Sequence, residues 1–384
     1  MKIKWILTLT LLCVIALVSL YFPKKVMLPT YFSYSKEEMS RLNTIPASRE
    51  LMTDSTLKKW DTLLFDLIKS NKIGDAPASR IYAYVYLAQR DAAFLSFNVK
   101  KQFYGSLDPI TAEVLCLFFP KDCTSIKMQK ETDSYSEALS DRVLKKINAR
   151  IASDTLQQKL PERPLGEAYW SGVKPYYGQE VGGWRTWIIS TPNQFLPAPP
   201  PKQKREWQAQ LNRVQDAVQH ITPSQTKAVV FWAGNPSTIT PPGIWLAFAN
   251  DYMDIEGSAF AKKLVVRSVL AMGIADAVIS AFYAKYTYWV KRPFMLDSHL
   301  QTIMPPPNHP SYPAAHSVVS ATAAVILSYY FPQNTKSWWQ KAQEASSSRV
   351  WGGIHFPLDT EIGLVMGANV GETVIRAEPQ FNIP

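Results

Sequence analysis

Cysteine and histidine are both scarce in this chain of 384 residues, which holds three cysteines and five histidines. Cys13 lies in the apolar N-terminus without the small residues of a lipoprotein site, which argues against acylation there. Cys116 and Cys123 are the other two cysteines. In an oxidising compartment they could close a short loop, and two free buried thiols are the equally open alternative.

Long alternating strands, internal repeats and dense charge are also missing. No segment alternates apolar and polar residues over the length of a strand, and no repeat of 34 or 40 residues is visible. The formal charge of +10 falls to about +6 when the four lysines of the first 25 residues are set aside. The remaining charge is spread along the chain, which favours small anionic substrates or surfaces over a nucleic-acid groove.

Helical patterns joined by proline-rich loops fill most of the chain, and 47% of the residues are hydrophobic. The strongest loop signals are at 195–204 and 237–243. The fold class is therefore predicted as all-α. Apolar spacing and helix-start signals predict helices over 57–70, 77–97, 134–152, 204–220, 257–291, 313–331, 337–348 and 357–375.

The N-terminus carries an uncharged, mostly apolar run over 5–22 that follows two lysines. Residues 1–25 are predicted to be an uncleaved signal anchor or a cleaved signal peptide, with a buried core helix as the third alternative. Either of the first two exports the rest of the protein. No second transmembrane segment is predicted, because charged residues interrupt the long apolar run over 264–290.

Candidate chemistry concentrates between residues 285 and 359, where four of the five histidines lie. Lys285 and Arg292 are seven residues apart, or two helical turns, so both are predicted to project from one helix face near its C-terminus. Pro293 disfavours the helical conformation at Arg292. Two like charges on one stripe are unfavourable unless an anion lies between them, and an ordinary solvated basic face is the alternative.

A second block, "PSYPAAHS", covers residues 310–317 and follows His309. Pro313 suits the start of a helix, whose next amides, on Ala314, Ala315 and His316, would have no partner inside the helix. With the helix dipole they would form an anion site, and His316 could donate a proton to the bound group. A core histidine is the alternative reading of His316.

The third block is "SRVWGGIHFPLD", with Arg349 and His355 six residues apart around two glycines. A loop is predicted to bring both side chains to one pocket. Asp359 follows His355 by four residues, close enough to accept the Nδ1 proton and leave Nε2 free to attack. A metal site is the less favoured alternative, because the neighbours are cations and not further histidines, cysteines or carboxylates.

Together, the blocks K-x6-R-P, P-A-A-H and S-R-x5-H-x3-D resemble the signature of the type 2 phosphatidic acid phosphatase and vanadium-dependent haloperoxidase superfamily. The segments "ASRIYAYVYLAQRDAAF" and "ADAVISAFYAKYTYWVKRP" are similar to its soluble haloperoxidase-like branch. "HPSYP", with His309, is similar to the bromoperoxidase form. The resemblance implies a helical bundle, in which an N-terminal helical region, 26–250, packs on a catalytic region, 251–384.

The chain departs from the family pattern at Ala314, where P-S-G-H would place a serine hydroxyl on an oxyanion oxygen. The backbone amide of Ala315 is retained. One hydrogen bond to a charged group contributes about 1.5–3 kcal/mol. The loss therefore implies weaker retention of vanadate more than weaker turnover of phosphate.

The resemblance also implies a role for each matching residue. The cation triad (Lys285, Arg292 and Arg349) would bind the phosphoryl oxygens. Asp359 would hold the tautomer of His355, which would attack phosphorus. His316 would protonate the leaving oxygen and then activate water.

We therefore expect a phosphatase that hydrolyses phosphate monoesters without a metal or other cofactor. A membrane anchor favours lipid or envelope-precursor phosphates, and soluble phosphorylated molecules are equally compatible. The alternatives are a haloperoxidase that holds vanadate, with His309 lining the pocket, and a non-catalytic anion-binding module. The expected location is the periplasmic or extracytoplasmic side, with the membrane contacted through 5–22 and with no nucleic-acid partner.

Overall fold

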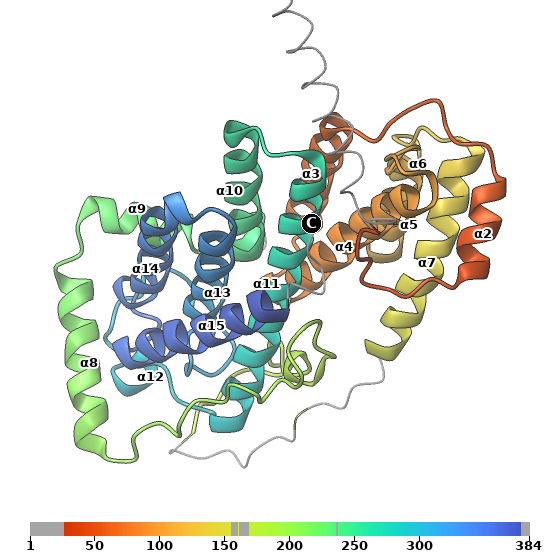
Figure 1. The fold of residues 1–384 in the computed structure, drawn as a ribbon. Coiled ribbons are helices and arrows are strands. Elements are labelled where there is room, and N and C mark those ends of the chain that lie inside the picture. The colour runs from red at the N-terminus through yellow and green to blue at the C-terminus, as the bar shows by residue number, and fades with distance from the viewer. Residues whose placement is uncertain (1–26, 155–159, 161–168, 236, 378–384) are drawn as a thin grey trace, which may run out of the picture.

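The computed structural model describes residues 27–154, 160, 169–235 and 237–377, and in these residues the fold is all-α, as predicted (Figure 1). Their one β-contact is an isolated bridge between Leu51 and Tyr104. The α-helices are α2 (Lys36–Thr44), α3 (Asp54–Ser70), α4 (Asp75–Lys100), α5 (Asp108–Phe118), α6 (Cys123–Lys127), α7 (Ser134–Asp154), α8 (Lys204–Gln219), α9 (Pro223–Phe231), α10 (Thr240–Glu256), α11 (Phe260–Tyr288), α12 (Pro293–Leu296), α13 (Ala315–Tyr330), α14 (Thr335–Trp351) and α15 (Pro357–Ala377).

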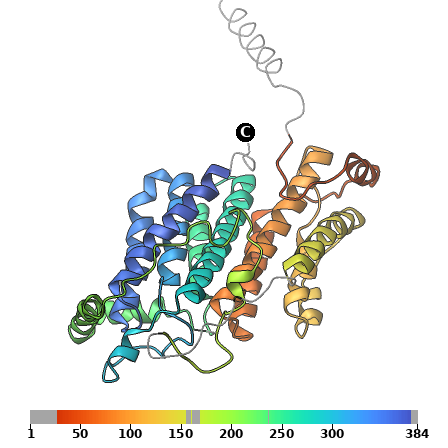
Figure 2. The same ribbon diagram turned by 90° about the horizontal axis from the view of Figure 1, so that it is seen from below.

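The long helix α11 forms the centre of the molecule. It packs against α4 on one side and α13 on the other, as both views show (Figures 1 and 2). A helix that is apolar on all sides belongs in a core. Within the described residues, Phe260–Leu296 is the one span long and apolar enough to cross a membrane, and its apolar window is wholly buried inside the protein. One buried charged residue of α11, Asp276, accepts the backbone amide of Trp187 at 2.7 Å.

Three helices, α13, α14 and α15, form the C-terminal bundle that carries most of the candidate site (Figure 1). The close approach of α15 to α13 depends on a glycine. A Cβ atom at Gly367 would lie 2.1 Å from the carbonyl oxygen of Val318. Because backbone cannot yield that far, this crossing fixes the middle of α15 against the first turn of α13, which contains His316. His355 lies two residues before α15.

The N-terminal helices form a layer on the side of α11 that faces away from the C-terminal bundle, with α5 and α7 packed on α4 (Figure 2). One continuous hydrophobic core includes buried residues from this layer and from the C-terminal bundle. Cys116 and Cys123 form a disulfide that joins the end of α5 to the start of α6. Of the two alternatives that the sequence left open, a disulfide or two free thiols, the structure shows the disulfide.

Several element predictions need correction. The predicted loop at 237–243 is in part a helix, because α10 begins at Thr240. Its two prolines occupy the first turn, where a missing N–H leaves no helical bond unmade. Helices α2, α5, α6, α9, α10 and α12 were not predicted. The predicted membrane segment at 5–22 lies outside the described residues.

Candidate active site

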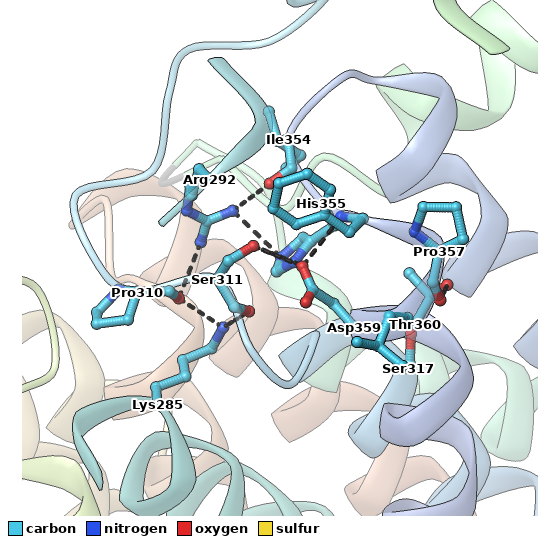
Figure 3. A network of polar contacts seen from close by, with 12 residues as sticks. Lys285, Arg292, Pro310, Ser311, Ser317, Ile354, His355, Pro357, Asp359 and Thr360 are labelled. Carbon is cyan, nitrogen blue, oxygen red and sulfur yellow. Dashed lines mark hydrogen bonds and ion pairs between the residues drawn. The ribbon is translucent and has the colours of Figure 1, made fainter. Parts of the chain in front are cut away.

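Lys285 and Arg292 converge, although they do not share a helix face as predicted. The helix α11 ends before Trp289, whose left-handed backbone (φ 52°) caps it. Arg292 is extended (φ −94°, ψ 160°), as the following Pro293 demands. The two side chains meet at the carbonyl oxygen of Pro310, which lies 2.9 Å from Lys285 Nζ and 3.4 Å from Arg292 Nη2 (Figure 3).

The start of α13 offers fewer free amides than predicted. The helix begins at Ala315, with Ala314 as its N-cap residue, and the amide of Ala314 donates to the carbonyl of Asp359 at 3.0 Å. The amides of Ala315 and His316 have no hydrogen-bond partner among the described residues. Of the three amides predicted to bind an anion, those of Ala315 and His316 are therefore available. The third, on Ala314, is used in the contact with α15.

His316 is oriented by a residue far away in the sequence. Its Nε2 lies 2.8 Å from the backbone carbonyl oxygen of Trp232. Because a carbonyl only accepts hydrogen bonds, Nε2 carries a proton. No described residue hydrogen-bonds Nδ1 of His316.

His355 is held in the tautomer that a nucleophile needs. Its Nε2 lies 3.2 Å from Nη1 of Arg292, and its Nδ1 lies 3.0 Å from Oδ2 of Asp359 (Figure 3). A guanidinium only donates, so Nε2 is unprotonated and the ring proton lies on Nδ1, facing the carboxylate. The turn before His355 uses Gly353 in the left-handed region (φ 74°).

The cation triad is completely buried. Lys285, Arg292 and Arg349 each have 0% exposure. Arg349, in the last turn of α14, donates to the carbonyl of Val229 at 3.1 Å and contacts the Met304 sulfur at 3.3 Å. These partners are neutral, so they satisfy the hydrogen-bonding groups of Arg349 and leave its charge uncompensated.

Burial of this uncompensated charge shifts the pKa values of the triad. Burial lowers the pKa of Arg292 to about 9. Burial, followed by the nearby Arg292 charge, lowers the pKa of Arg349 to about 9. The pKa of Lys285 falls well below its usual range for the same two reasons, in the same order. A bound anion with two negative charges would offset these penalties.

The neighbouring acid and histidines respond to the same environment. Burial raises the pKa of Asp359 to about 6. Burial and the surrounding cations lower the pKa values of His355 and His316 well below their usual range. His355 is therefore neutral at neutral pH, as a nucleophilic imidazole must be.

His309 lies against the triad on the side of the aromatic core. Its Nδ1 is 3.3 Å from Nη2 of Arg292, and its ring centroid lies 5.2 Å from that of Phe282 and 5.8 Å from that of Tyr177. Burial and the nearby cations lower its pKa well below the usual range. The structure thus places His309 beside Arg292, among the site residues that were predicted from the sequence.

Three groups at the site escaped the sequence analysis. The carbonyls of Val229 and Trp232, at the end of α9, contact Arg349 and His316, and a backbone carbonyl leaves no sequence signal. The hydroxyl of Ser311 donates to Asp359 (Figure 3). Ser311 stands inside the "PSYPAAHS" block, where its small polar side chain was a visible signal. Among the described residues, no three metal-ligating side chains cluster at this or any other place.

Comparison with known proteins gives a family match for the C-terminal part of the chain. Residues 264–382 match the model of the PAP2 superfamily. This part of the chain belongs to the PAP2 superfamily. An undecaprenyl-diphosphatase of Sulfolobus acidocaldarius is 28% identical over 31% of the chain, and a non-specific acid phosphatase of Salmonella typhi is 31% identical over 27%. The matches span 58% and 42% of the length of these two relatives.

Solved structures with a similar fold extend the likeness to most of the chain. A bacterial vanadium-dependent iodoperoxidase, 21% identical, covers 86% of this chain and 98% of its own, with a TM-score of 0.67. An apo-type bacterial vanadium-dependent chloroperoxidase, 13% identical, covers 80% of this chain and 95% of its own, with a TM-score of 0.63. The N-terminal helices thus belong to the same overall fold as the PAP2 part.

Proposed function

We propose that this protein is a phosphatase that hydrolyses phosphate monoesters through a phosphohistidine on His355. The observation that carries the proposal is a buried triad of cations around an unprotonated imidazole nitrogen, whose ring is fixed by a carboxylate. Both curated relatives are phosphatases by name, which supports this choice.

In the first step, the triad binds the phosphoryl oxygens, and the Nε2 lone pair of His355 forms a bond to phosphorus. The P–O bond to the leaving group breaks as the negative charge of the transition state stays between the buried cations. The Nδ1 proton remains on the ring, which becomes positively charged. Asp359 stabilises that charge, because its Oδ2 lies 3.0 Å from Nδ1. The leaving oxygen takes a proton from His316.

His316 can supply this proton once the substrate is bound. In the free protein, burial and then the cations, Arg349 foremost, keep its pKa low. A phosphate dianion offsets these cations, so the pKa of His316 rises and the ring takes a second proton on Nδ1. In the second step, the neutral ring accepts a proton from water, which attacks phosphorus and breaks the P–N bond to release phosphate.

The proposed setting is the extracytoplasmic side of a membrane, with residues 5–22 as an anchor. The apolar run and the Cys116–Cys123 disulfide support it, because disulfides persist in oxidising compartments. Phosphorylated lipids or envelope precursors are the substrates that such an anchor would bring close. The name of the undecaprenyl-diphosphatase relative points to the same chemical class.

A vanadium-dependent haloperoxidase is the second candidate, favoured by the contact between His309 and Arg292. The triad and Nε2 of His355 fit a vanadate anion, whereas Ala314 lacks the hydroxyl that the family pattern provides. Bound vanadate would supply the activation of hydrogen peroxide for halide oxidation. In that case the triad and His355 would hold the anion.

Purified full-length protein in detergent tests both candidates. We expect turnover of a generic phosphomonoester that His355→Ala lowers at least about a thousandfold, and His316→Ala by roughly a hundred- to ten-thousandfold. A parallel assay with vanadate, hydrogen peroxide and bromide should show little oxidation. Near-wild-type hydrolysis by His355→Ala would refute the phosphohistidine route, and strong bromide oxidation without hydrolysis would favour the haloperoxidase.

A further inference from the structure

Ser311 is a completely buried polar residue to which the proposed mechanism gives no role. Its side chain has 0% exposure, and its hydroxyl lies 2.5 Å from Oδ2 of Asp359 and 3.3 Å from Nδ1 of His355. Figure 3 shows this hydroxyl directed at the carboxylate, between the loop before α13 and the start of α15. The segment that carries His316 is thereby linked to the one that carries the nucleophile.

The backbone of Ser311 is fixed independently of its hydroxyl. Its amide donates to the carbonyl of Val290 at 2.9 Å, and its own carbonyl accepts from Lys285 Nζ at 2.7 Å. The hydroxyl is therefore aimed by a rigid backbone that is itself bonded to the cation triad. Replacing the hydroxyl alone leaves these two contacts in place.

The side-chain hydrogen bonds of Asp359 all go to one of its two oxygens, so the Ser311 hydroxyl is one of few groups that stabilise the carboxylate. Oδ2 accepts from Ser311, His355 and the amide of Phe356, at 3.0 Å for each of the last two. Oδ1 is buried with no hydrogen-bond partner in the described part of the chain. The hydrogen bonds that stabilise the charged carboxylate thus come from these three donors, one of which is the nucleophile itself, and the charges of Lys285 and Arg292 add to them.

We infer that Ser311 is a positioning residue for the proposed reaction, which keeps Asp359 ionised and aligned so that His355 holds its proton on Nδ1. This inference rests on the proposed function. The geometry excludes a serine-hydrolase triad, because Ser311 and Asp359 approach the same nitrogen of His355 and no base faces the hydroxyl from another side. Chemically, Ser311 acts on the side of the nucleophile that is opposite the bound phosphoryl group.

The inference predicts a change in pH dependence. Hydrolysis needs ionised Asp359, so its rate should rise with pH as that carboxylate, with a pKa of about 6, loses its proton. The Ser311 hydrogen bond lowers this pKa. In Ser311→Ala the pKa should rise, which moves the acidic limb of the kcat profile upward by about one to two pH units. The other charged or titratable groups that face the carboxylate, which the substitution leaves in place, are Lys285, Arg292, His355 and Tyr312.

The test compares Ser311→Ala with two matched variants in the full-length protein. Ser311→Thr keeps a hydroxyl and should restore the wild-type profile. Ser317→Ala removes another buried hydroxyl nearby, one that bonds Ser346 at 2.7 Å, and should leave the profile unmoved. Near pH 6, kcat of Ser311→Ala should fall about five- to fiftyfold, with KM unchanged because the hydroxyl does not touch the substrate.

A second readout does not depend on turnover. NMR titration of carbon-13-labelled aspartate carboxyls, with Asp359→Asn to assign the signal, should show the same upward shift in Ser311→Ala. If the wild type hydrolyses no phosphomonoester, the proposed function fails, while this titration still decides the role of Ser311. An unmoved titration and acidic limb in Ser311→Ala would overturn the inference, as would an equal shift in Ser317→Ala. Loss of all turnover at every pH in Ser311→Ala would also contradict a positioning role.

Discussion

Replacing Arg349 by glutamine should stabilise the anion-free protein while it disables the site. Arg349 is buried with 0% exposure, and burial lowers its pKa from its usual value to about 9. A lowered pKa on a cation means that the charged form is disfavoured in the folded state. At pH 7, below both values, the folded protein must carry that charge, and the difference corresponds to roughly 5 kcal/mol.

The substitution also removes favourable contacts, which reduces the gain. A glutamine amide can still donate to the carbonyl of Val229, whereas the contacts with Met304 and Ser348 are lost. At about 1–1.5 kcal/mol each, these two losses leave a net stabilisation of about 2–3 kcal/mol. For a chain of 384 residues, this corresponds to an increase in Tm of roughly 3 °C.

Thermal unfolding in phosphate-free buffer, and again with inorganic phosphate, measures both effects. Arg213→Gln is the matched control, because its ion pair with Glu361 is exposed and should contribute little. Phosphate should raise the Tm of the wild type more than that of Arg349→Gln. If Arg349→Gln melts below the wild type without phosphate, or responds equally to phosphate, the account of an uncompensated buried cation is wrong.

Three further predictions concern other parts of the molecule. Ala314→Ser should tighten inhibition by vanadate about ten- to a hundredfold, and unchanged inhibition would show that the Ala314 methyl does not face the anion. Replacing Cys116 and Cys123 together by serine should lower the free energy of unfolding by about 2–3 kcal/mol in denaturant titrations, and no change would show that the disulfide is dispensable. Alkaline washing should leave the full-length protein in the membrane fraction, whereas release in a shortened form would favour signal cleavage over an anchor.

The sequence predicted the strongest structural features well. The long helices α4, α11 and α15 were located because their patterns extend over many turns, although α11 ends three residues earlier than predicted. The predicted loop at 237–243 failed because a proline pair fits a first helical turn as well as it fits a loop. The short α9 gave no distinct signal, because its apolar residues do not follow one helical face.

The candidate site was predictable where side chains carry the chemistry. Charge and spacing identified the triad, both histidines and Asp359, and the contact between His355 and Asp359 is the one expected from their spacing. The prediction that Lys285 and Arg292 share a helix face was wrong, because the helix ends at the Trp289 cap, before Arg292. The orientation of His316 was unpredictable, since it depends on the Trp232 carbonyl, 84 residues away in the sequence.

The most direct test of the central claim is to trap the phosphoryl group on the protein. Full-length protein is mixed with a phosphorus-32-labelled phosphomonoester, quenched in alkali within milliseconds and digested, because phosphohistidine survives alkali and is lost in acid. The account predicts an alkali-stable, acid-labile label on the peptide that contains His355, and no label in His355→Ala. A label on another residue, or rapid hydrolysis without any label at His355, would contradict it.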